Sequence, residues 1–356
     1  MREKRWLLCG SKTIKCLICK SCSKTHQPPN HHPENPLRIK VLQRYFYKTC
    51  REVNVGAAVE HNFYTLYRVH DRDYVENMLK MLKTVRKPVY LDEDTYIEPT
   101  TIQAVKETLA VLTHAVELLT SKQYEHVVAL VRPPSHHAGR RRFGGFCIFN
   151  LSATATAYLL DSYDTIAVVD FDAHYGDGFA EIFYEDDRVL YISLHEDPRY
   201  MFPYRGFPEE AGRGKGLGYT VNIVMPVGAT DKHYRRALNE IVQPLLKAIR
   251  PKAVVVLLGL DTHRKDELTD INATLNIYAE FGKFIQHYSP SLTILEGGYN
   301  LWVLPRGIAN YIAGLEGREQ PYREEEHPIP LEVDRRFERF MDRTRKIVRR
   351  HLRIDL

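Results

Sequence analysis

Reactive side chains are densest in residues 165–178, which read Thr-Ile-Ala-Val-Val-Asp-Phe-Asp-Ala-His-Tyr-Gly-Asp-Gly. The apolar first half is typical of a buried strand in a parallel sheet. Asp170, Asp172 and His174 follow at alternate positions, so in an extended backbone their side chains point the same way. Carboxylate and imidazole groups together suit a cation such as zinc. Because a solvated strand end has the same pattern, the metal interpretation needs partners from elsewhere.

Reactive side chains also follow three other apolar runs of the sequence. They are His136 and His137, Asp261, and Tyr299. Asp261 supplies a third protein ligand and leaves a position for water or substrate, as catalytic zinc requires. The tandem histidines can do acid–base chemistry, with Asp170 and Asp177 fixing their tautomers. Tyr299 can donate its hydroxyl to a developing oxyanion. Each residue has a structural explanation when taken singly, but together they predict an active site.

Strands and helices alternate along the chain, and this order predicts how the reactive residues meet. Strands are expected at residues 13–19, 126–131, 165–169, 188–193, 219–224, 253–258 and 292–295. Helices are expected at residues 37–47, from 69 onward, and at 100–120, 151–160, 231–249 and 275–288, with a kink at Pro244. Such alternation produces a parallel sheet whose ligands lie beyond the carboxyl ends of the strands. The predicted class is α/β: a single open domain with a largely parallel sheet of about eight strands, flanked by helices.

Composition indicates a globular protein without a membrane anchor. Hydrophobic residues make up 44% and charged residues 27% of the 356 positions, which is ordinary for such proteins. The longest apolar run, near residues 253–260, is too short to span a bilayer. The amino terminus has no secretory signal pattern. We therefore expect a cytoplasmic protein with no membrane partner.

Much of the net charge of +5 lies near the carboxyl terminus, where residues 335–353 contain nine Arg or Lys against two acids. Apolar residues recur there at helical spacing, namely Val333, Phe337, Phe340, Met341, Val348 and Leu352. This favours a basic amphipathic helix packed on the body over a nucleic-acid contact. The predicted organisation is an amino-terminal extension (1–12), a catalytic domain (13–320) and a carboxyl-terminal segment (321–356) packed on that domain.

Cysteines and histidines near the amino terminus have two interpretations. Cys16, Cys19 and Cys22 are spaced C-x2-C-x2-C, which could mark a zinc or iron–sulfur site. They could instead be small apolar side chains of the first strand, where positions three apart face opposite sides. We favour the structural interpretation and leave the metal interpretation open. His31 and His32, which lie among prolines, are expected to be exposed loop residues.

The reactive residues belong to an ordered set of motifs that spans most of the chain. The motifs are His32-Pro-Glu-Asn-Pro-Leu-Arg38, Arg132-Pro-Pro-Ser-His-His-Ala-Gly139, Gly144-Gly-Phe-Cys147, Asp170-Phe-Asp-Ala-His-Tyr-Gly-Asp-Gly178, Ser193-Leu-His195, Gly259-Leu-Asp261 and Glu296-Gly-Gly-Tyr-Asn300. In this set the chain resembles the zinc-dependent histone deacetylases of the arginase/deacetylase superfamily, a group that includes acetylpolyamine amidohydrolases and prokaryotic deacetylase-like proteins. The resemblance implies their fold and hydrolysis of an acetylated amine, of acetyl-lysine or acetylpolyamine type, to free amine and acetate.

The resemblance also implies a role for each matching residue. Zinc would be held by Asp172, His174 and Asp261. The catalytic residues would be His136 with Asp170, His137 with Asp177, and Tyr299. Gly145, Phe146 and Phe202 would line the substrate tunnel, and Arg38 an acetate channel. Potassium would bind at one site made by Asp170, Asp172, His174, Ser193 and Leu194, and at a peripheral site made by Phe183, Asp186, Val189 and Tyr219.

Three positions depart from the family pattern without removing a catalytic group. Ser135 stands where glycine is usual, Tyr175 where histidine or another polar residue is common, and Leu151 where Asn or Asp is frequent. The loop before His32 matches no subgroup well. The substrate therefore stays open between protein acetyl-lysine, an acetylpolyamine and another acylated amine, and the oligomeric state is equally open.

Two other functions are compatible with parts of the pattern. A binuclear manganese ureohydrolase shares Asp172-Ala-His174, but it needs a second carboxylate where this chain has Asp261-Thr-His263. A non-catalytic acetyl-group binder is the other alternative. Such a protein would have lost a ligand or the tyrosine, whereas this sequence keeps them all.

Overall fold

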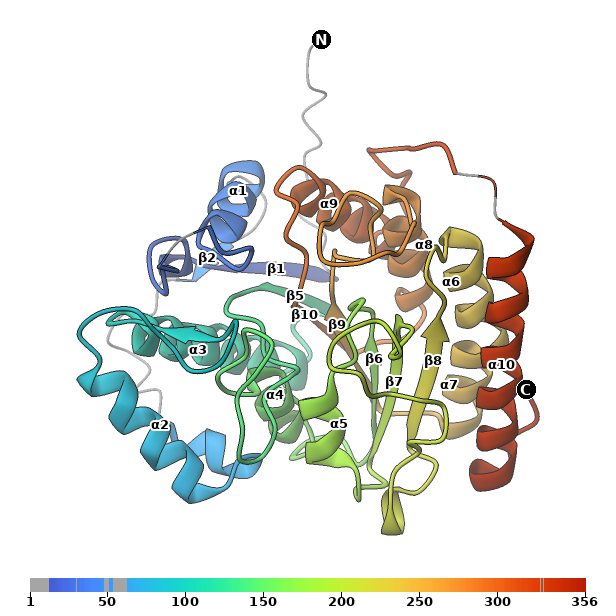
Figure 1. Ribbon diagram of the computed structural model, residues 1–356, viewed down its shortest axis with the longest axis horizontal. Helices are drawn as coiled ribbons and strands as arrows, with labels where there is room; N and C mark the ends of the chain where they lie inside the picture. Colours follow the sequence, from blue (N-terminus) through green and yellow to red (C-terminus); the bar gives the residue numbers. More distant parts are fainter. Residues whose placement is uncertain (1–12, 30, 48–50, 54–62, 327, 329) are drawn as a thin grey trace.

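A parallel β-sheet crosses the whole molecule and is built from the apolar runs of the sequence (Figure 1). The computed structural model describes residues 13–29, 31–47, 51–53, 63–326, 328 and 330–356, so the expected extension of residues 1–12 lies outside the described residues. Within these ranges the sheet has eight strands, in the order β2 (Arg51–Val53), β1 (Ile14–Cys19), β5 (His126–Leu130), β10 (Ser291–Leu295), β9 (Ala253–Leu258), β6 (Ile166–Asp170), β7 (Val189–Glu196) and β8 (Thr220–Met225). All neighbouring pairs are parallel. The predicted α/β class and largely parallel sheet are confirmed.

The strand that carries the aspartates, β6, lies between β9 and β7. Its last residue, Asp170, is in register with Leu257 of β9 and Ser193 of β7. Both β6 and β9 are buried at every position, as expected of strands covered on both faces. Because these neighbours run in the same direction and end at a similar level, the residues that follow them meet at one edge of the sheet.

Helices cover both faces of the sheet (Figure 1). The helices are α1 (Leu37–Phe46), α2 (Arg72–Thr84), α3 (Thr101–Thr120), α4 (Leu151–Leu159), α5 (Asp177–Phe183), α6 (Asp231–Ala237), α7 (Gln243–Ile249), α8 (Leu275–Ile285), α9 (Val303–Leu315) and α10 (Leu331–Leu352). In Figure 1, α3 and α4 lie on one face and α1, α8 and α9 on the other. Helices α6 and α10 pack against the edge strand β8. The sheet is therefore the middle layer of three.

Several elements were not expected from the sequence. Helices α5 and α9 are two of them, and an antiparallel hairpin of β3 (Val89–Tyr90) and β4 (Tyr96–Ile97) is another. The helix expected at 231–249 is divided by a π-helical segment, η4 (Leu238–Val242), which ends two residues before Pro244. A proline has no N–H to continue the helical ladder, so the chain widens one turn ahead of it. The remaining short helices are η1 (Ser21–Ser23), η2 (Phe63–Arg68) and η3 (Gly214–Gly216).

For Cys19 and Cys22, the expectation of separate apolar side chains in the first strand was wrong. Cys19 and Cys22 form a disulfide bond rather than serving as independent apolar side chains. Strand β1 ends at Cys19, and Cys22 lies in the 3-10 turn η1, so the alternation of a strand does not apply between them. Both are buried.

The basic carboxyl-terminal helix α10 buries its apolar stripe against the sheet edge. Phe337, Met341 and Val348 are buried, and Thr344 Oγ1 donates a hydrogen bond to Asn222 O of β8 (2.7 Å). Many of its arginines pair with acids, as Arg343 does with Glu209 at 2.6 Å. Among the residues that the structure describes, no helix combines the length and the hydrophobicity that a bilayer crossing requires.

Helices α8 and α9 approach closely at glycines on their facing sides. A Cβ at Gly282 would lie 2.0 Å from Tyr311 O, and one at Gly314 would lie 2.1 Å from Ala279 O. These are backbone oxygens, which cannot rotate away. The two helices can therefore pack at this distance only because neither position carries a side chain.

We predict that Gly282→Ala lowers the free energy of unfolding by about 1–3 kcal/mol, because the helices must separate to admit the methyl group. The clash outweighs the gain in helix propensity of about 1 kcal/mol. Denaturant unfolding measures the change. Lys283→Ala, at the exposed neighbouring position, is the control and should stay within about 0.5 kcal/mol. A Gly282→Ala protein as stable as the wild type would contradict the packing described.

Candidate active site

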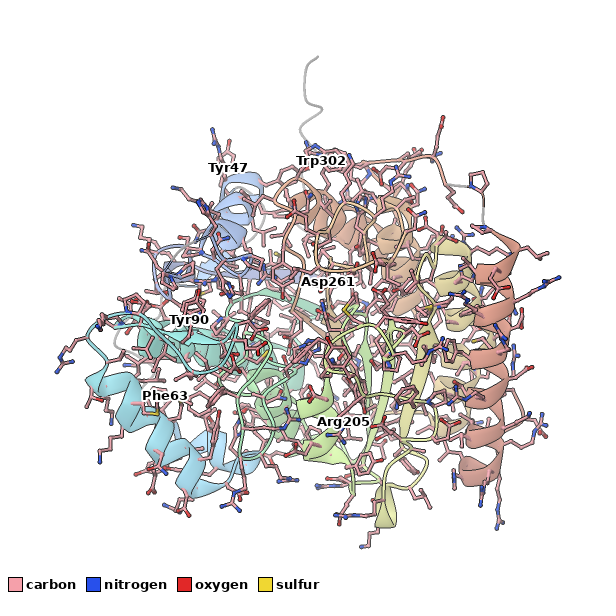
Figure 2. The ribbon with its side chains drawn as sticks, viewed as in Figure 1. Tyr47, Phe63, Tyr90, Arg205, Asp261 and Trp302 are labelled. Carbon is pink, nitrogen blue, oxygen red and sulfur yellow. A yellow bond between two sulfur atoms is a disulfide. The ribbon has the colours of Figure 1, made fainter. Side chains whose placement is uncertain are left out.

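Three potential metal ligands converge beyond the carboxyl ends of β6 and β9. Asp172 and His174 follow β6, and Asp261 follows β9. His174 Nδ1 lies 3.1 Å from Asp172 Oδ1 and 3.2 Å from Asp261 Oδ2. One ligand atom from each residue lies within 4.8 Å of the others, and both aspartates are fully buried. Asp261, labelled in Figure 2, lies near the centre of the molecule.

The surroundings of these ligands fit a divalent cation. Each carboxylate accepts a hydrogen bond from a backbone N–H group at one of its oxygens: Gly297 N donates to Asp172 Oδ2 (2.7 Å) and Ala173 N to Asp261 Oδ1 (3.0 Å). Burial opposes the charge on His174, but hydrogen bonds to the two aspartates outweigh it and raise the pKa of His174 well above its usual value. Two buried carboxylates therefore concentrate negative charge at one imidazole, and an Asp–His–Asp set is a zinc-type donor set.

The tandem histidines each face a different aspartate. His136 Nδ1 lies 3.1 Å from Asp170 Oδ2, and His137 Nδ1 lies 2.9 Å from Asp177 Oδ1. The sequence-predicted pairs thus meet in space. A carboxylate at Nδ1 fixes the tautomer, which leaves Nε2 as the atom that faces a reactant.

The two histidines differ in charge because their surroundings differ. Burial opposes the charge on His136, but Asp172 and Asp170 outweigh it and raise the pKa of His136 to about 10. A cation bound by Asp172 would offset part of this increase. Burial and the charge on His136 lower the pKa of His137 to about 4, although Asp177 opposes the shift. The two pKa values therefore shift in opposite directions, and His137 is the histidine that is more readily neutral at neutral pH.

Tyr299 sits on a glycine turn that Arg38 holds in place. The Arg38 guanidinium is fully buried, donates to Gly298 O (2.8 Å) and Glu296 O, and lies over the Tyr299 ring, 4.9 Å from its centroid. Gly298 has a φ of +103°, and a Cβ there would lie 2.6 Å from Leu260 Cβ. The turn therefore needs both the glycine and the arginine.

Arg38 is one end of a buried ionic network that sequence reasoning did not identify. Glu34 accepts two hydrogen bonds from Arg132, at 2.7 Å each, and a longer one from Arg38 Nη1 at 3.4 Å. Burial would raise the pKa of Glu34, but Arg132 outweighs it and lowers this pKa to about 2. All three side chains are fully buried. The network joins the loop after β1 to the turn that carries Tyr299.

The expected tunnel residues lie around the histidines and the tyrosine. Phe202 stacks edge-on to the His137 ring with centroids 5.0 Å apart, and Phe146 does so to Tyr299 at 5.6 Å. A Cβ at Gly145 would lie 2.5 Å from His137 and 2.9 Å from Phe202, so only glycine fits between them. His32, which we expected to be exposed, is instead buried against Phe146. A cavity of about 980 Å³ opens beside Tyr299 and is also lined by Lys40, Glu267 and Trp302.

The residues expected at the potassium sites lie at the end of β6 and just after it, on β7, at the end of α5 and in the segment that follows it, and directly before β8. Ser193 and Leu194 are buried on β7, and the Ser193 hydroxyl contacts His195 Nδ1 at 2.8 Å. At the peripheral set, Asp186 N donates to Phe183 O (3.0 Å). The Tyr219 carbonyl accepts from Tyr191 N (2.8 Å), and Val189 begins β7. Potassium at either set remains a proposal.

Four other side chains support the site without having been assigned a role from the sequence. Tyr191 donates to Asp170 Oδ2 (2.7 Å), Arg142 pairs with Asp177 Oδ2 (2.8 Å), Asp266 accepts from Tyr299 N (2.7 Å), and Glu296 accepts from Ser135 Oγ (2.8 Å). Glu296 and Ser135 both lie within the motifs quoted above. Their hydrogen bond gives a partner to Ser135, the serine that stands where glycine is usual. Asp266 and Arg142 lie in loops, where no periodic pattern marks a contact.

Comparison with known proteins agrees with this geometry. Residues 32–315 match the model of the histone deacetylase domain. A probable deacetylase of Archaeoglobus fulgidus is 36% identical over 271 residues, which are 74% of this chain and 74% of the relative. An acetylpolyamine amidohydrolase of Mycoplana ramosa is 35% identical over 227 residues, 63% of this chain and 66% of the relative. The crystal structure of the HDA15 HD domain superposes with a TM-score of 0.83 at 26% identity, covering 94% of this chain and 95% of that one.

The chain therefore belongs to the histone deacetylase family. Its relatives include proteins named for deacetylation of histones and of polyamines. Membership indicates a hydrolase of the deacetylase type, with an arginase/deacetylase fold as expected from the motifs.

We predict that Glu34→Gln lowers the free energy of unfolding by about 3–5 kcal/mol, because two buried arginines lose their counter-charge. Chemical denaturation measures this. The control is Glu76→Gln, which removes an exposed ion pair with Arg72 (3.3 Å) and should cost less than about 1 kcal/mol. Equal effects of the two substitutions would show that the buried network does not stabilise the fold.

Proposed function

We propose that this protein is a zinc-dependent deacetylase that hydrolyses the acetamide of an acetylated amine to the free amine and acetate. The observation that carries the proposal is the placement of two histidines, each backed by its own aspartate, beside three buried metal-type ligands. Zinc held by Asp172, His174 and Asp261 would supply Lewis acidity toward the acetamide carbonyl and the attacking water. The remaining steps are carried by the chain's own side chains.

His137 is the proposed general base and later general acid. It is neutral at pH 7 because burial and the charge on His136 lower its pKa to about 4. Its Nδ1 is engaged by Asp177, so Nε2 takes the proton of the attacking water and returns it to the leaving amine. His136 keeps its proton and stabilises negative charge that develops on the acetamide.

Tyr299 is the proposed oxyanion donor. A tyrosine hydroxyl is protonated at neutral pH, and burial raises the pKa of Tyr299 still further above its usual value. Arg38 lies over the ring, and Phe146 packs against it in an edge-to-face contact. A phenol held in this way donates without first having to reorganise, which is how oxyanion holes lower barriers.

The proposed substrates are acetyl-lysine in protein or an acetylated polyamine. Aromatic rings of Phe146 and Phe202 suit the methylene chain that both substrates present. A parallel assay of acetyl-lysine peptides, acetylpolyamines and longer acyl amines, each with and without a chelator, tests the proposal. We expect chelator-sensitive release of acetate from at least one acetylated amine. No turnover of any of them by the metal-loaded protein would refute the proposal.

Potassium at the two sets described above is proposed as a structural ion.

We predict that Tyr299→Phe lowers kcat by about 100- to 1000-fold, because the oxyanion loses a donor. The KM should change much less, since the ring that packs on Arg38 and Phe146 remains. Steady-state kinetics on the best acetylated substrate separate the two constants. An unchanged kcat would remove Tyr299 from the mechanism.

We predict that Asp177→Asn lowers kcat by about 10- to 100-fold, because His137 loses the carboxylate that fixes its tautomer. Glu181→Gln is the matched control. Glu181 contacts the same arginine, Arg142, at 3.0 Å but does not touch His137. Its substitution should leave kcat within about twofold of the wild type. If both variants lost activity equally, the effect would belong to Arg142 rather than to the histidine.

A further inference from the structure

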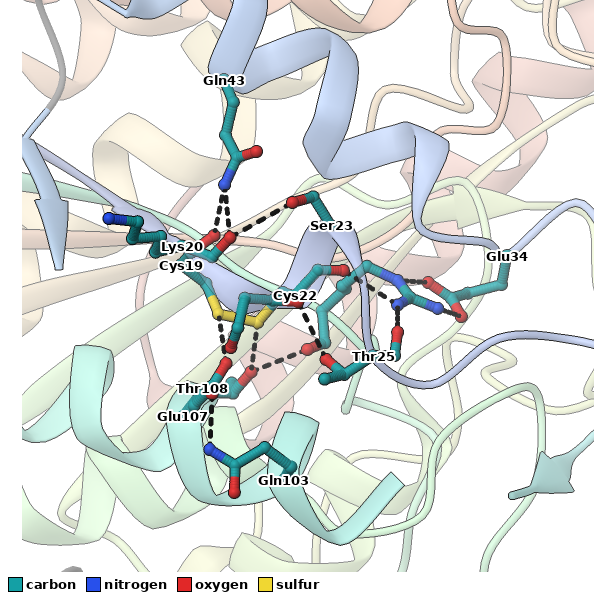
Figure 3. The surroundings of a disulfide bond; sticks show 12 residues. Cys19, Lys20, Cys22, Ser23, Thr25, Glu34, Gln43, Gln103, Glu107 and Thr108 are labelled. Atoms are coloured by element: carbon teal, nitrogen blue, oxygen red, sulfur yellow. Dashed lines mark hydrogen bonds and ion pairs between the residues drawn. A yellow bond between two sulfur atoms is a disulfide. The ribbon is translucent and has the colours of Figure 1, made fainter. Parts of the chain in front are cut away.

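Two cysteines and one carboxylate that are not among the proposed catalytic residues form a buried cluster (Figure 3). Cys19 ends β1 and Cys22 follows in η1, and their Cα atoms are 5.5 Å apart. Glu107, on α3, faces them: its Oε2 lies 3.7 Å from Cys19 Sγ. Thr108 Oγ1 lies 3.8 Å from Cys22 Sγ. We call Cys19, Cys22 and Glu107 the thiol cluster.

Glu107 is poorly satisfied while the two sulfurs are bonded to each other. Only 7% of this residue is exposed. Its Oε1 accepts from Gln103 Nε2 (2.6 Å), but Oε2 faces the sulfur of Cys19, which has no proton in a disulfide. Among the residues that the structure describes, no Arg, Lys or His forms an ion pair with Glu107. Burial accordingly raises the pKa of Glu107. A buried carboxylate in this position calls for a proton donor or a cation.

We propose that Cys19, Cys22 and Glu107 are the protein ligands of a second metal site, which binds zinc or another thiophilic divalent cation once the disulfide is reduced. One potential ligand atom from each residue lies within 4.8 Å of the others, and all three residues are buried. Thiolates with a carboxylate are zinc ligands. A water or a further side chain would complete a tetrahedral ion.

In this proposal, Cys19 and Cys22 form a disulfide bond when they are oxidised and bind the metal when they are reduced. In the reducing step, two thiols supply two electrons and two protons. The bond between the cysteine sulfurs breaks, the thiols become a disulfide, and the protons end on Cys19 and Cys22. Metal binding then displaces these protons, since thiolates are the ligands. The positive charge of the cation also compensates the negative charge of the Glu107 carboxylate. The uncharged disulfide cannot do this.

Cobalt(II) distinguishes this site from the catalytic one. The catalytic ligands are two aspartates and a histidine, so cobalt there gives no thiolate-to-metal charge-transfer absorption. We expect this near-ultraviolet band in protein kept in a phosphine reductant and loaded with Co²⁺, with thiol titration confirming that the pair is reduced. The band should be lost in the Cys19→Ser, Cys22→Ser double variant. Cys147→Ala, which removes the buried free thiol beside Gly145, should retain it.

The third ligand is tested by affinity. Glu107→Gln should weaken Co²⁺ binding at the thiolate band by at least about tenfold. Glu117→Gln, at an exposed position on the same helix, should leave it unchanged. The proposal is overturned if reduced wild-type protein shows no thiolate band, if the band survives in the double variant, or if Glu107→Gln binds cobalt as the wild type does.

Discussion

The burial of Asp172 and Asp261 around one imidazole is the constraint that shapes this molecule. Two carboxylates taken out of water cost free energy unless cations and donors compensate them. Gly297 and Ala173 supply N–H donors to these carboxylates. A Cβ at Gly297 would lie 2.1 Å from Asp261 Oδ2, so only a glycine can bring the backbone this close to the aspartates. The residual negative charge is what a divalent cation would match. Against the effect of burial, Asp172 and Asp170 raise the pKa of His136, whereas burial and the charge on His136 lower the pKa of His137.

The fold could be predicted from the sequence because the patterns that indicate its main strands and helices lie within short stretches of the chain. Apolar runs such as 253–258 and 166–170 are strands buried on both faces, and alternation with helices dictates a parallel sheet. That the histidine pair meets Asp170 and Asp177 followed from the rule that parallel strands end at one edge, whereas the assignment of Asp170 to His136 came from the family resemblance. Short or irregular elements lack this periodicity, so α5 and the β3–β4 hairpin were missed.

Contacts between loops could not be predicted, because no spacing encodes them. His32 was expected to be exposed, yet it is buried between Phe146 and Tyr96. The cysteine pair was misjudged for a related reason: the strand ends at Cys19, so the next thiol turns back toward α3. That turn also contacts the buried ionic network, since Cys22 O accepts from Arg132 Nη1 (3.1 Å). The loop after β1 thus adjoins both the proposed thiol site and the arginine that anchors Glu34.

The central claim is that one ion at Asp172, His174 and Asp261 is required for hydrolysis of an acetylated amine. Its most direct test is a zinc titration of chelator-treated Cys19→Ser, Cys22→Ser protein, in which the thiol cluster cannot contribute a site. Bound zinc and released acetate are measured in the same samples. We expect activity to be absent without metal and to rise in proportion to bound zinc until one ion is bound per chain. Turnover in the metal-free protein, or zinc bound at one equivalent without turnover, would contradict the account.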